Sequence, residues 1–256
     1  MAKFLDTVYS LWLREILRFT KSKSRLIGTG GQPLIWLAIV GVGIGSVLTG
    51  IGGTSYITYI APGVIGMTLL FTSIFAGINV IMDKQFGFLK EILVSPVSRV
   101  AIVVGKIAGS ATVSLITALI VFVIIIAVGV IPISSLTPLG LAEAIIFMVL
   151  IASIFVSIGL VIASYVNNLE GFQVIMNFLI LPLFFLSGAL FPLTTAPEWM
   201  QTIAGIDPLR YGVDGMRGAL IGAGNYPVWL DLTVVFAISV VLLLIADRAF
   251  RKMQAK

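Results

Sequence analysis

Long stretches without an ionisable side chain constrain this chain more than any other feature. The longest lies between Arg25 and Asp83, and residues 107–142, 144–169 and 171–197 also contain no Asp, Glu, Lys or Arg. An α-helix needs about 20 apolar residues to cross the hydrocarbon core of a bilayer, so each stretch is long enough to do so. Since 59% of the 256 residues are hydrophobic and 11% are charged, against roughly a quarter charged in a soluble domain, we predict an all-α polytopic membrane protein.

Six membrane-spanning helices are predicted when these stretches are divided at Gly, Pro and charge clusters. The expected spans are residues 33–50, 56–82, 100–129, 139–166, 172–189 and 227–246. We expect residues 1–256 to form a single transmembrane domain. Residues 1–32 would be a head at the membrane interface, 83–98 a connection between the second and third spans, and 190–226 a segment before the last span.

The distribution of basic residues predicts the orientation of the spans. Of the sixteen Lys and Arg residues, Arg210 and Arg217 fall on one side of the membrane and the other fourteen on the opposite side. Basic residues are enriched in cytoplasmic connections, so we expect a multi-pass protein of the cell (inner) membrane with both termini in the cytoplasm. Because the net charge of +5 follows this distribution, we expect membrane lipid, and no nucleic acid, among the partners.

The N-terminal head carries apolar residues at helical spacing. They are Phe4, Leu5, Val8, Leu11, Trp12 and Ile16. Because the charged residues lie mostly elsewhere, this pattern is typical of a helix that lies along the cytoplasmic interface before the chain enters the membrane. The alternative is a partly ordered basic tail.

Residues 190–226 are partly apolar, but prolines and glycines divide them into pieces too short to cross a bilayer. Pro197 and Pro208 fit the first turns of two short helices, with Asp207 as the N-cap of the second. We expect this helix pair either to lie at the outer surface or to dip into the membrane and return as a re-entrant segment.

Three charged residues in this segment are spaced to share one helix face. Asp214 is four residues after Arg210 and three before Arg217. Side chains at these spacings are neighbours on a helix surface. We therefore predict an external ion-pair ladder.

Residues 83–98 are amphipathic and lie on the predicted cytoplasmic side. The apolar stripe consists of Phe86, Leu89, Ile92 and Leu93, and the charged side of Lys84, Lys90 and Glu91. Pro96 ends the predicted helix. Such a helix is suited to dock in a groove of a soluble partner, and the alternative is a helix that rests on lipid headgroups. The residues alone leave both readings open.

Two stretches resemble the type-2 permeases of ABC exporters. DKQFGFLKEILVSPVSRVAIVVGK (residues 83–106) is similar to the first cytoplasmic connection of these permeases. SGALFPLTTAPEWMQTIAGIDPLRYGVDGMRG (residues 187–218) is similar to the stretch before their last span, with Asp207 where Asn is more usual. The match runs in register from the basic head to the basic tail and covers essentially the whole chain.

The resemblance implies a coupling helix, which in such permeases is seated in a cleft of an ATP-binding subunit. Its residues here would be Phe86, Gly87, Phe88, Leu89, Lys90, Glu91 and Pro96. The resemblance also implies two permease subunits, expected here as a homodimer, that work with two ABC-type ATP-binding subunits. Its implied function is the export of an amphipathic substrate of drug, lipid or glycan type.

The chain contains no nucleotide-binding motif. A phosphate-binding loop ends in Gly-Lys-Ser/Thr, whereas the only Gly-Lys pair, Gly105–Lys106, is followed by Ile107. We therefore expect no enzymatic activity and no cofactor here, with ATP and Mg on the partner subunit. The absence of His and Cys removes the commonest ligands of a metal site. The alternative function is a gradient-driven secondary transporter, which would normally need ionisable groups near the membrane midplane.

Sparse polar side chains in two spans are candidates for lining a substrate pathway. They are Thr68 and Thr72 in the second span and Gln173 and Asn177 in the fifth. The alternative is that they form hydrogen bonds with a neighbouring helix.

Overall fold

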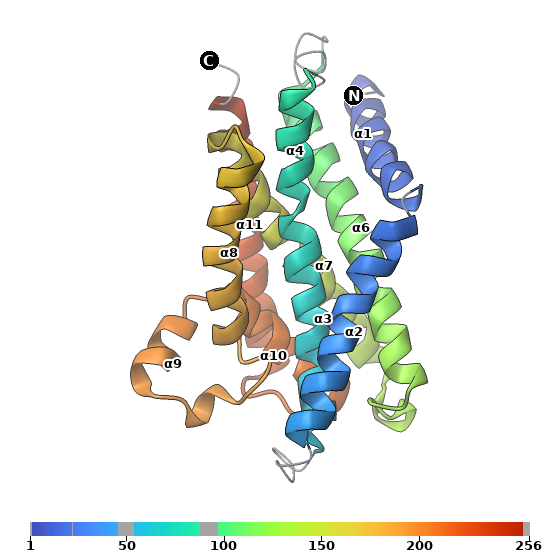
Figure 1. The fold of residues 1–256 in the computed structure, drawn as a ribbon, viewed down its shortest axis with the longest axis vertical. Coiled ribbons are helices and arrows are strands. Elements are labelled where there is room, and N and C mark those ends of the chain that lie inside the picture. The colour runs from blue at the N-terminus through green and yellow to red at the C-terminus, as the bar shows by residue number, and fades with distance from the viewer. Residues whose placement is uncertain (1, 22, 46–53, 88–96, 253–256) are drawn as a thin grey trace.

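The computed structural model describes residues 2–21, 23–45, 54–87 and 97–252, and this part of the chain is all-α (Figure 1). Its α-helices are α1 (Ala2–Thr20), α2 (Lys23–Gly45), α3 (Tyr56–Ile74), α4 (Ala76–Gln85), α6 (Arg99–Ala127), α7 (Pro138–Tyr165), α8 (Leu169–Leu186), α9 (Glu198–Ala204), α10 (Pro208–Ile221) and α11 (Val228–Lys252). Short 3₁₀ turns occur at Ile133–Ser135 and Leu193–Thr195. No strand occurs within the described ranges, which confirms the predicted fold class for them.

Among the residues that the structure describes, five helical stretches are long and apolar enough to cross a bilayer. They are Tyr56–Gln85, which joins α3 and α4, and then Arg99–Ala127, Pro138–Tyr165, Leu169–Leu186 and Val228–Lys252. These five correspond to the second to sixth predicted spans. The first predicted span overlaps a shorter apolar helix, Gly31–Gly45, and its last residues lie outside the described ranges.

Helix α2 begins at Lys23 rather than near Pro33, so the second part of the predicted head belongs to the helix that follows it. Pro33 lies inside α2 and does not start it. Neighbouring helices and local backbone adjustments can compensate for the hydrogen bond that a proline removes from an apolar helix.

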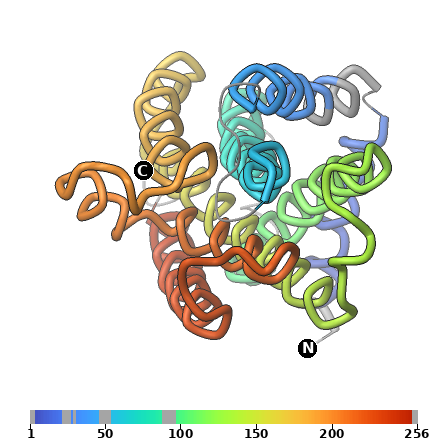
Figure 2. The backbone as a smooth tube through the Cα atoms, turned by 90° about the horizontal axis from the view of Figure 1, so that it is seen from below, coloured from blue at the N-terminus to red at the C-terminus, as the bar shows by residue number. Residues whose placement is uncertain are grey.

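Helix α7 is the central helix of the bundle and contacts α3, α4, α6, α10 and α11. Its Phe147, Ile151 and Phe155 side chains are completely buried. Other helices surround this core, and α9 projects from its edge (Figure 2). The sequence of α7 is apolar on all sides, as expected for a helix that other helices enclose.

Glycines let several helices approach α7 and α3 closely. A β-carbon at Gly215 of α10 would overlap the Phe147 ring, and one at Gly159 of α7 would lie 2.5 Å from the carbonyl oxygen of Ile74. Small residues at helix contacts are the main means of close packing between apolar helices.

The two short helices of residues 190–226 have different surroundings. Helix α10 packs against α3, α7 and α11 and starts at Pro208, with the Asp207 side chain accepting a hydrogen bond from the backbone N–H of Leu209. The predicted N-cap is therefore confirmed. Helix α9, in contrast, exposes Trp199 to 63%.

Helix α1 packs along α6 rather than standing apart from the bundle. β-Carbons at Gly105 and Gly109 of α6 would come within 3.2 Å of the α1 backbone at Val8 and Trp12. The indole N–H of Trp12 donates a hydrogen bond to Thr112 of α6 at 3.1 Å. The Gly105–Gly109 edge of α6 is thus a helix-packing surface.

Candidate functional site

The start of α1, the end of α11 and the end of α4 lie at the same end of the bundle (Figure 1). We call this the termini end, and the opposite end, which carries α10, the α10 end. The predicted coupling segment, residues 83–98, therefore starts at the termini end.

Two of the predicted coupling residues are described. The backbone N–H groups of Phe86 and Gly87 bond to the carbonyls of Met82 and Lys84 and close the last turn of α4. Phe86 is 78% exposed, and Gly87 has a φ of 75°, a left-handed conformation that glycine adopts without strain. The other predicted coupling residues, Phe88, Leu89, Lys90, Glu91 and Pro96, lie outside the described residues.

Asp83, one turn before Phe86, binds basic side chains from two other helices. Its Oδ2 atom lies 2.5 Å from Nζ of Lys106 on α6, and its Oδ1 atom lies 2.7 Å from a guanidinium nitrogen of Arg14 on α1. Asp83 is 6% exposed and Lys106 is 2% exposed. This buried ion pair was not predicted from the sequence. The sequence feature that indicates it is two opposite charges, each at the end of a neighbouring apolar stretch.

Lys84 contacts a different helix from its neighbour Asp83. Its ammonium group donates hydrogen bonds to the carbonyl oxygens of Ala163 at 2.6 Å and Val166 at 3.3 Å. These residues lie at the C-terminal end of α7, where carbonyl groups have no partner within the helix. Lys84 therefore caps α7.

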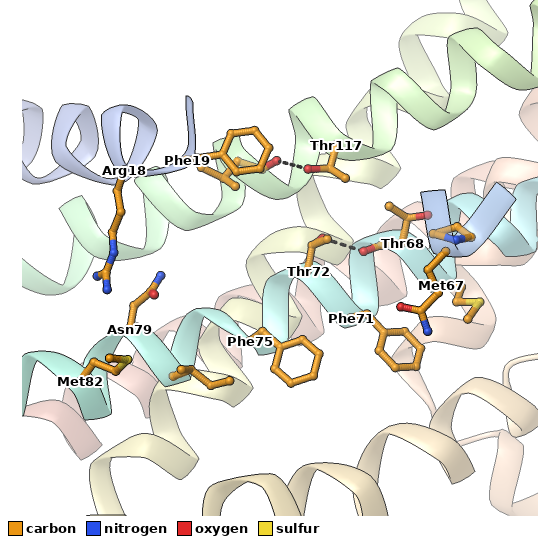
Figure 3. Close-up of a pocket in the computed structure, with 14 residues that line it drawn as sticks. Arg18, Phe19, Met67, Thr68, Phe71, Thr72, Phe75, Asn79, Met82 and Thr117 are labelled. Carbon is orange, nitrogen blue, oxygen red and sulfur yellow. Dashed lines mark hydrogen bonds between the residues drawn. The ribbon is translucent and has the colours of Figure 1, made fainter. Parts of the chain in front are cut away.

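A cavity of about 420 Å³ lies between α1, α2, α3, α4 and α6 (Figure 3). Its lining consists of Arg18, Phe19, Gln32, Pro33, Met67, Thr68, Phe71, Thr72, Phe75, Ile78, Asn79, Met82, Val113 and Thr117. The predicted pathway residues Thr68 and Thr72 are thus both at the cavity, although their hydroxyl groups donate to carbonyls of α3 itself. Aromatic and thioether side chains with a few polar groups are typical of a site for an amphipathic small molecule.

The other two predicted pathway residues lie elsewhere. Gln173 and Asn177 are exposed on α8, on the same helix as Phe178, which is 81% exposed. Neither residue lines the cavity at Thr68 and Thr72. The structure therefore does not bring the four predicted residues together.

At the α10 end, Asp214 and Arg217 form a buried cluster. Their closest charged atoms are 3.5 Å apart, and both side chains are at most 4% exposed. The Arg217 guanidinium also donates to the carbonyl oxygens of Tyr59 at 3.3 Å and Gly188 at 2.9 Å. The Asp214 carboxylate accepts hydrogen bonds from the backbone N–H groups of Asn225 and Tyr226.

Arg210, the third residue of the predicted ladder, binds other partners. Its guanidinium donates to the carbonyl oxygen of Gln201 at 3.2 Å and to the Tyr226 hydroxyl at 3.0 Å. It also lies 5.6 Å from the centre of the Tyr226 ring. The structure thus brings Asp214 and Arg217 together, whereas Arg210 contacts Gln201 and Tyr226 instead of Asp214.

A second acid at this end, Asp207, has an unusual environment. Asp207 is 3% exposed, and its Oδ2 atom has no hydrogen-bond partner among the described residues. Burial raises the pKa of this carboxyl to about 7, although the Leu209 N–H and Arg210 act in the opposite direction. An amide would meet the same capping requirement without a charge to bury.

The Gly105–Lys106 pair lies within helix α6, where Lys106 is buried against Asp83. A phosphate-binding loop would instead present its backbone N–H groups ahead of a helix. Within the described ranges, no group of three or more Asp or Glu residues could hold a metal ion.

Comparison with known proteins decides the family. The family model described as ABC-2 type transporter matches residues 7–221. The chain belongs to the ABC-2 type transporter family. It is also 25% identical over 246 residues to nodulation protein J of Rhizobium leguminosarum bv. viciae, covering 95% of this chain and 93% of that protein.

Two further relatives are named as transport permeases. The inner membrane transport permease YadH of Escherichia coli K12 is 26% identical over 242 residues, or 91% of each chain. The putative transport permease ycf38 of Pyropia yezoensis is 27% identical over 224 residues, covering 83% of this chain and 73% of the relative.

Family membership fixes the general role. The chain is an integral membrane protein and the membrane subunit of an ABC transporter. It is a transport permease and not an enzyme, since the ATPase is on a partner subunit. This replaces the gradient-driven secondary transporter that the residues alone had left open.

Proposed function

We propose that this ABC-2 permease is the transmembrane subunit of an exporter that moves an amphipathic substrate out of the cytoplasm. ATP and Mg bind to a separate ATP-binding subunit, which seats on the coupling segment of residues 83–98. The observation that carries the proposal is the position of α4, which ends at the termini end (Figure 1) and is followed directly by the exposed Phe86. An exposed aromatic residue at the start of an amphipathic segment suits a groove on a soluble partner.

The orientation follows from charge. Fourteen of the sixteen basic residues lie on the termini side of the six-span arrangement. In the inner membrane, this side therefore faces the cytoplasm. The start of α1 and the end of α11 lie at the same end of the bundle (Figure 1), which supports an even number of spans. A reporter fused after Lys256 should therefore be active only as a cytoplasmic fusion, and activity only in the external compartment would contradict the orientation.

The substrate class follows from the cavity at Thr68 and Thr72. Phe71, Phe75 and Met67 supply apolar lining, and Arg18 supplies a cation (Figure 3). A volume of about 420 Å³ falls within the usual range of sites for drug-sized ligands. These features favour an amphipathic molecule over a bare ion.

A second copy of the permease is expected at α8. Gln173 and Asn177 are exposed on this candidate span, and hydrocarbon offers an amide no hydrogen-bond partner. Amide side chains commonly bond across helix pairs in membranes. We therefore expect a homodimer in which these amides face the partner copy, and Asn177→Leu should weaken it more than Phe178→Leu.

The experiment that tests the proposal is coexpression with an ABC ATP-binding subunit. The permease alone should hydrolyse no ATP, and the two subunits should copurify. Leu89→Asp should insert normally but lose the ATPase subunit, because it places a charge in a desolvated contact, which typically costs several kcal/mol. Leu89 lies outside the described residues, so this expectation rests on the apolar stripe of the sequence.

The matched control is Glu91→Ala on the charged side of the same segment, which should weaken the complex mildly and in a salt-dependent way. Full retention of the ATPase subunit by Leu89→Asp would contradict the assignment of the segment. ATP hydrolysis by the permease alone, absent from mock preparations, would contradict the assignment of ATP hydrolysis to the partner subunit.

A further inference from the structure

The last turn of α4 carries two adjacent side chains of opposite charge that bind different helices. Successive residues of an α-helix point about 100° apart, so Asp83 and Lys84 face different neighbours. Asp83 binds Arg14 of α1 and Lys106 of α6, whereas Lys84 binds the end of α7. A single turn therefore connects α4 to three other helices.

The bond between α4 and α6 is a buried ion pair. Asp83 and Lys106 are both buried, and their 2.5 Å contact joins charges that have little access to water. Such pairs add little net stability compared with apolar residues, but loss of one partner is costly because a buried charge remains. Any displacement of the end of α4 must therefore carry Lys106 with it or break the pair at a large energetic cost.

The bond between α4 and α7 works through backbone rather than side chains. Lys84 donates to the carbonyls of Ala163, Ser164 and Val166, at 2.6, 3.4 and 3.3 Å. A cation at a helix C-terminus also interacts favourably with the helix dipole. Because these acceptors belong to the α7 backbone and to the residue that follows it, Lys84 holds the helix itself and not a flexible side chain.

We propose that Asp83 and Lys84 are positioning residues that pass movement of the coupling segment to the bundle along two separate routes. Asp83 transmits it to α1 and α6, and Lys84 transmits it to α7. This inference rests on the proposed function, in which an ATPase subunit moves the segment that begins immediately after these residues. Neither residue lines the cavity at Thr68 and Thr72.

The proposal makes a crossed prediction that a merely structural role does not make. If the two charges only stabilised the fold, removing either would disturb all the attached helices together. With two routes, loss of Asp83 should abolish the movement of α1 that ATP binding causes and leave the movement of α7 unchanged. Loss of Lys84 should do the reverse. The chain contains no Cys, so a single introduced Cys can report on each helix without a background signal.

The experiment uses the full permease, labelled with a fluorophore before assembly with its ATP-binding subunit in lipid nanodiscs. One label is placed on α1 by Leu5→Cys and the other, in a separate protein, at the end of α7 by Tyr165→Cys; the native side chains are 63% and 69% exposed. The signal is the fluorescence change between the nucleotide-free complex and the complex with ATP and vanadate. Copurification of the ATPase subunit is checked first for every variant.

Asp83→Asn should lose the α1 response and keep the α7 response, whereas Lys84→Met should lose the α7 response and keep the α1 response. Lys84→Arg keeps the cation and should restore the α7 response. Since Asp83→Asn leaves Lys106 buried without its main counter-ion, the double variant Asp83→Asn/Lys106→Gln provides a neutral pair that avoids misfolding. It should show the same selective loss at α1.

Arg99→Met is the matched control, because Arg99 is an exposed cation at the same end of the bundle, and it should keep both responses. The proposal is overturned if both labels respond normally in all charge variants, if both responses disappear together, or if the unmutated complex shows none. Failure of the ATPase subunit to copurify with the unmutated permease would instead contradict the proposed function.

Discussion

The two ends of the bundle hold their buried charges in different ways. At the α10 end, Arg217 donates to the backbone carbonyls of Tyr59 and Gly188, and Asp214 accepts from backbone N–H groups. At the termini end, Asp83 binds the flexible side chains of Arg14 and Lys106. The buried charges of the α10 end are thus tied to backbone groups. At the termini end, the buried Asp83 is held by side chains of two other helices, and Lys84 beside it binds backbone carbonyls of α7.

This difference indicates which end can move. A bond to a backbone group breaks only when the helix or loop that carries it moves. A bond from Asp83 to a long Arg or Lys side chain survives small helix displacements, because the rotamers of the long side chain can follow. A larger displacement of one helix then carries the other helix with it. The α10 end should therefore be the static part of the permease and the termini end the adjustable part, next to the segment that we assign to the ATPase subunit.

Arg217→Met should have the largest effect and tests the static end directly. The change leaves Asp214 without its cation and frees two buried carbonyls, and breaking a buried pair of this kind costs about 3–5 kcal/mol. We expect a sharp fall in the thermal midpoint of the purified protein, measured by Trp fluorescence, or failure to accumulate in the membrane.

Arg210→Met is the matched control at the same end, because Arg210 is only partly buried and bonds to Gln201 and Tyr226. It should cost about 1 kcal/mol, the usual contribution of a few hydrogen bonds. Similar midpoints for the two variants would remove the distinction between the buried cluster and its surroundings.

Asp207→Asn should stabilise the α10 end at neutral pH. The folded-state pKa of Asp207 is about 7, above its ordinary value of 3.8, so the folded state binds this proton more tightly than the unfolded state. The stability contributed by the neutral carboxyl is complete below pH about 4 and is lost as the pH rises to about 7. The Asn variant should therefore be about 2–4 kcal/mol more stable than the parent at pH 8.

The measurement is the unfolding midpoint of both proteins between pH 4 and pH 8. The midpoint difference should grow with pH, since Asn keeps the cap but has no proton to lose. A constant difference across this range would show that Asp207 is not the group responsible.

The sequence predicted the features that depend on local spacing. Charge-free stretches predicted the long helices, and Asp207 before Pro208 predicted the start of α10. The three-residue spacing of Asp214 and Arg217 predicted that their side chains lie together. Each follows from helix geometry within one segment.

Contacts between distant segments could not be predicted in the same way. Asp83 and Lys106 are 23 residues apart on different helices, and periodicity within a helix does not specify which neighbour it meets. For the same reason Asn177 was expected at a pathway but lies on an exposed face of α8. Arg210 does not join the predicted ion-pair ladder, because its guanidinium binds the Gln201 carbonyl and the Tyr226 hydroxyl. Both partners lie outside its own helix, so the spacing of residues within that helix could not predict them.

Glycine substitutions at the two ends of the bundle should have smaller effects than Arg217→Met. A β-carbon at Gly63 would overlap the backbone carbonyl of Ala189 and lie 2.7 Å from its Cα, beside the Gly188 carbonyl that binds Arg217. Gly63→Ala should therefore cost about 1–3 kcal/mol, as overpacking does.

The corresponding contact at the termini end is less severe. A β-carbon at Gly105 would lie 3.0 Å from the Leu11 side chain and 3.1 Å from the carbonyl oxygen of Val8. If α1 can shift by a few tenths of an ångström, the gain in helix propensity of about 1 kcal/mol offsets the crowding. Gly105→Ala should then have almost the parent midpoint, and a loss equal to that of Gly63→Ala would show that the termini end is just as rigid.

Arg18→Ala should have the smallest effect on stability and separates folding from transport at the termini end. Its guanidinium lies 3.9 Å from Asp83, with 37% of the side chain exposed, whereas Arg14 lies 2.7 Å away. Exposed pairs contribute about 0.5 kcal/mol or less, and salt screens them further. The thermal midpoint of Arg18→Ala should therefore match that of the parent, while Arg14→Ala lowers it.

Because Arg18 also lines the cavity at Thr68 and Thr72, a transport defect in this stable variant would arise from the cavity and not from the fold. A midpoint loss as large as that of Arg14→Ala would instead make Arg18 a full member of the Asp83 cluster, and the adjustable end would then depend on three cations rather than two.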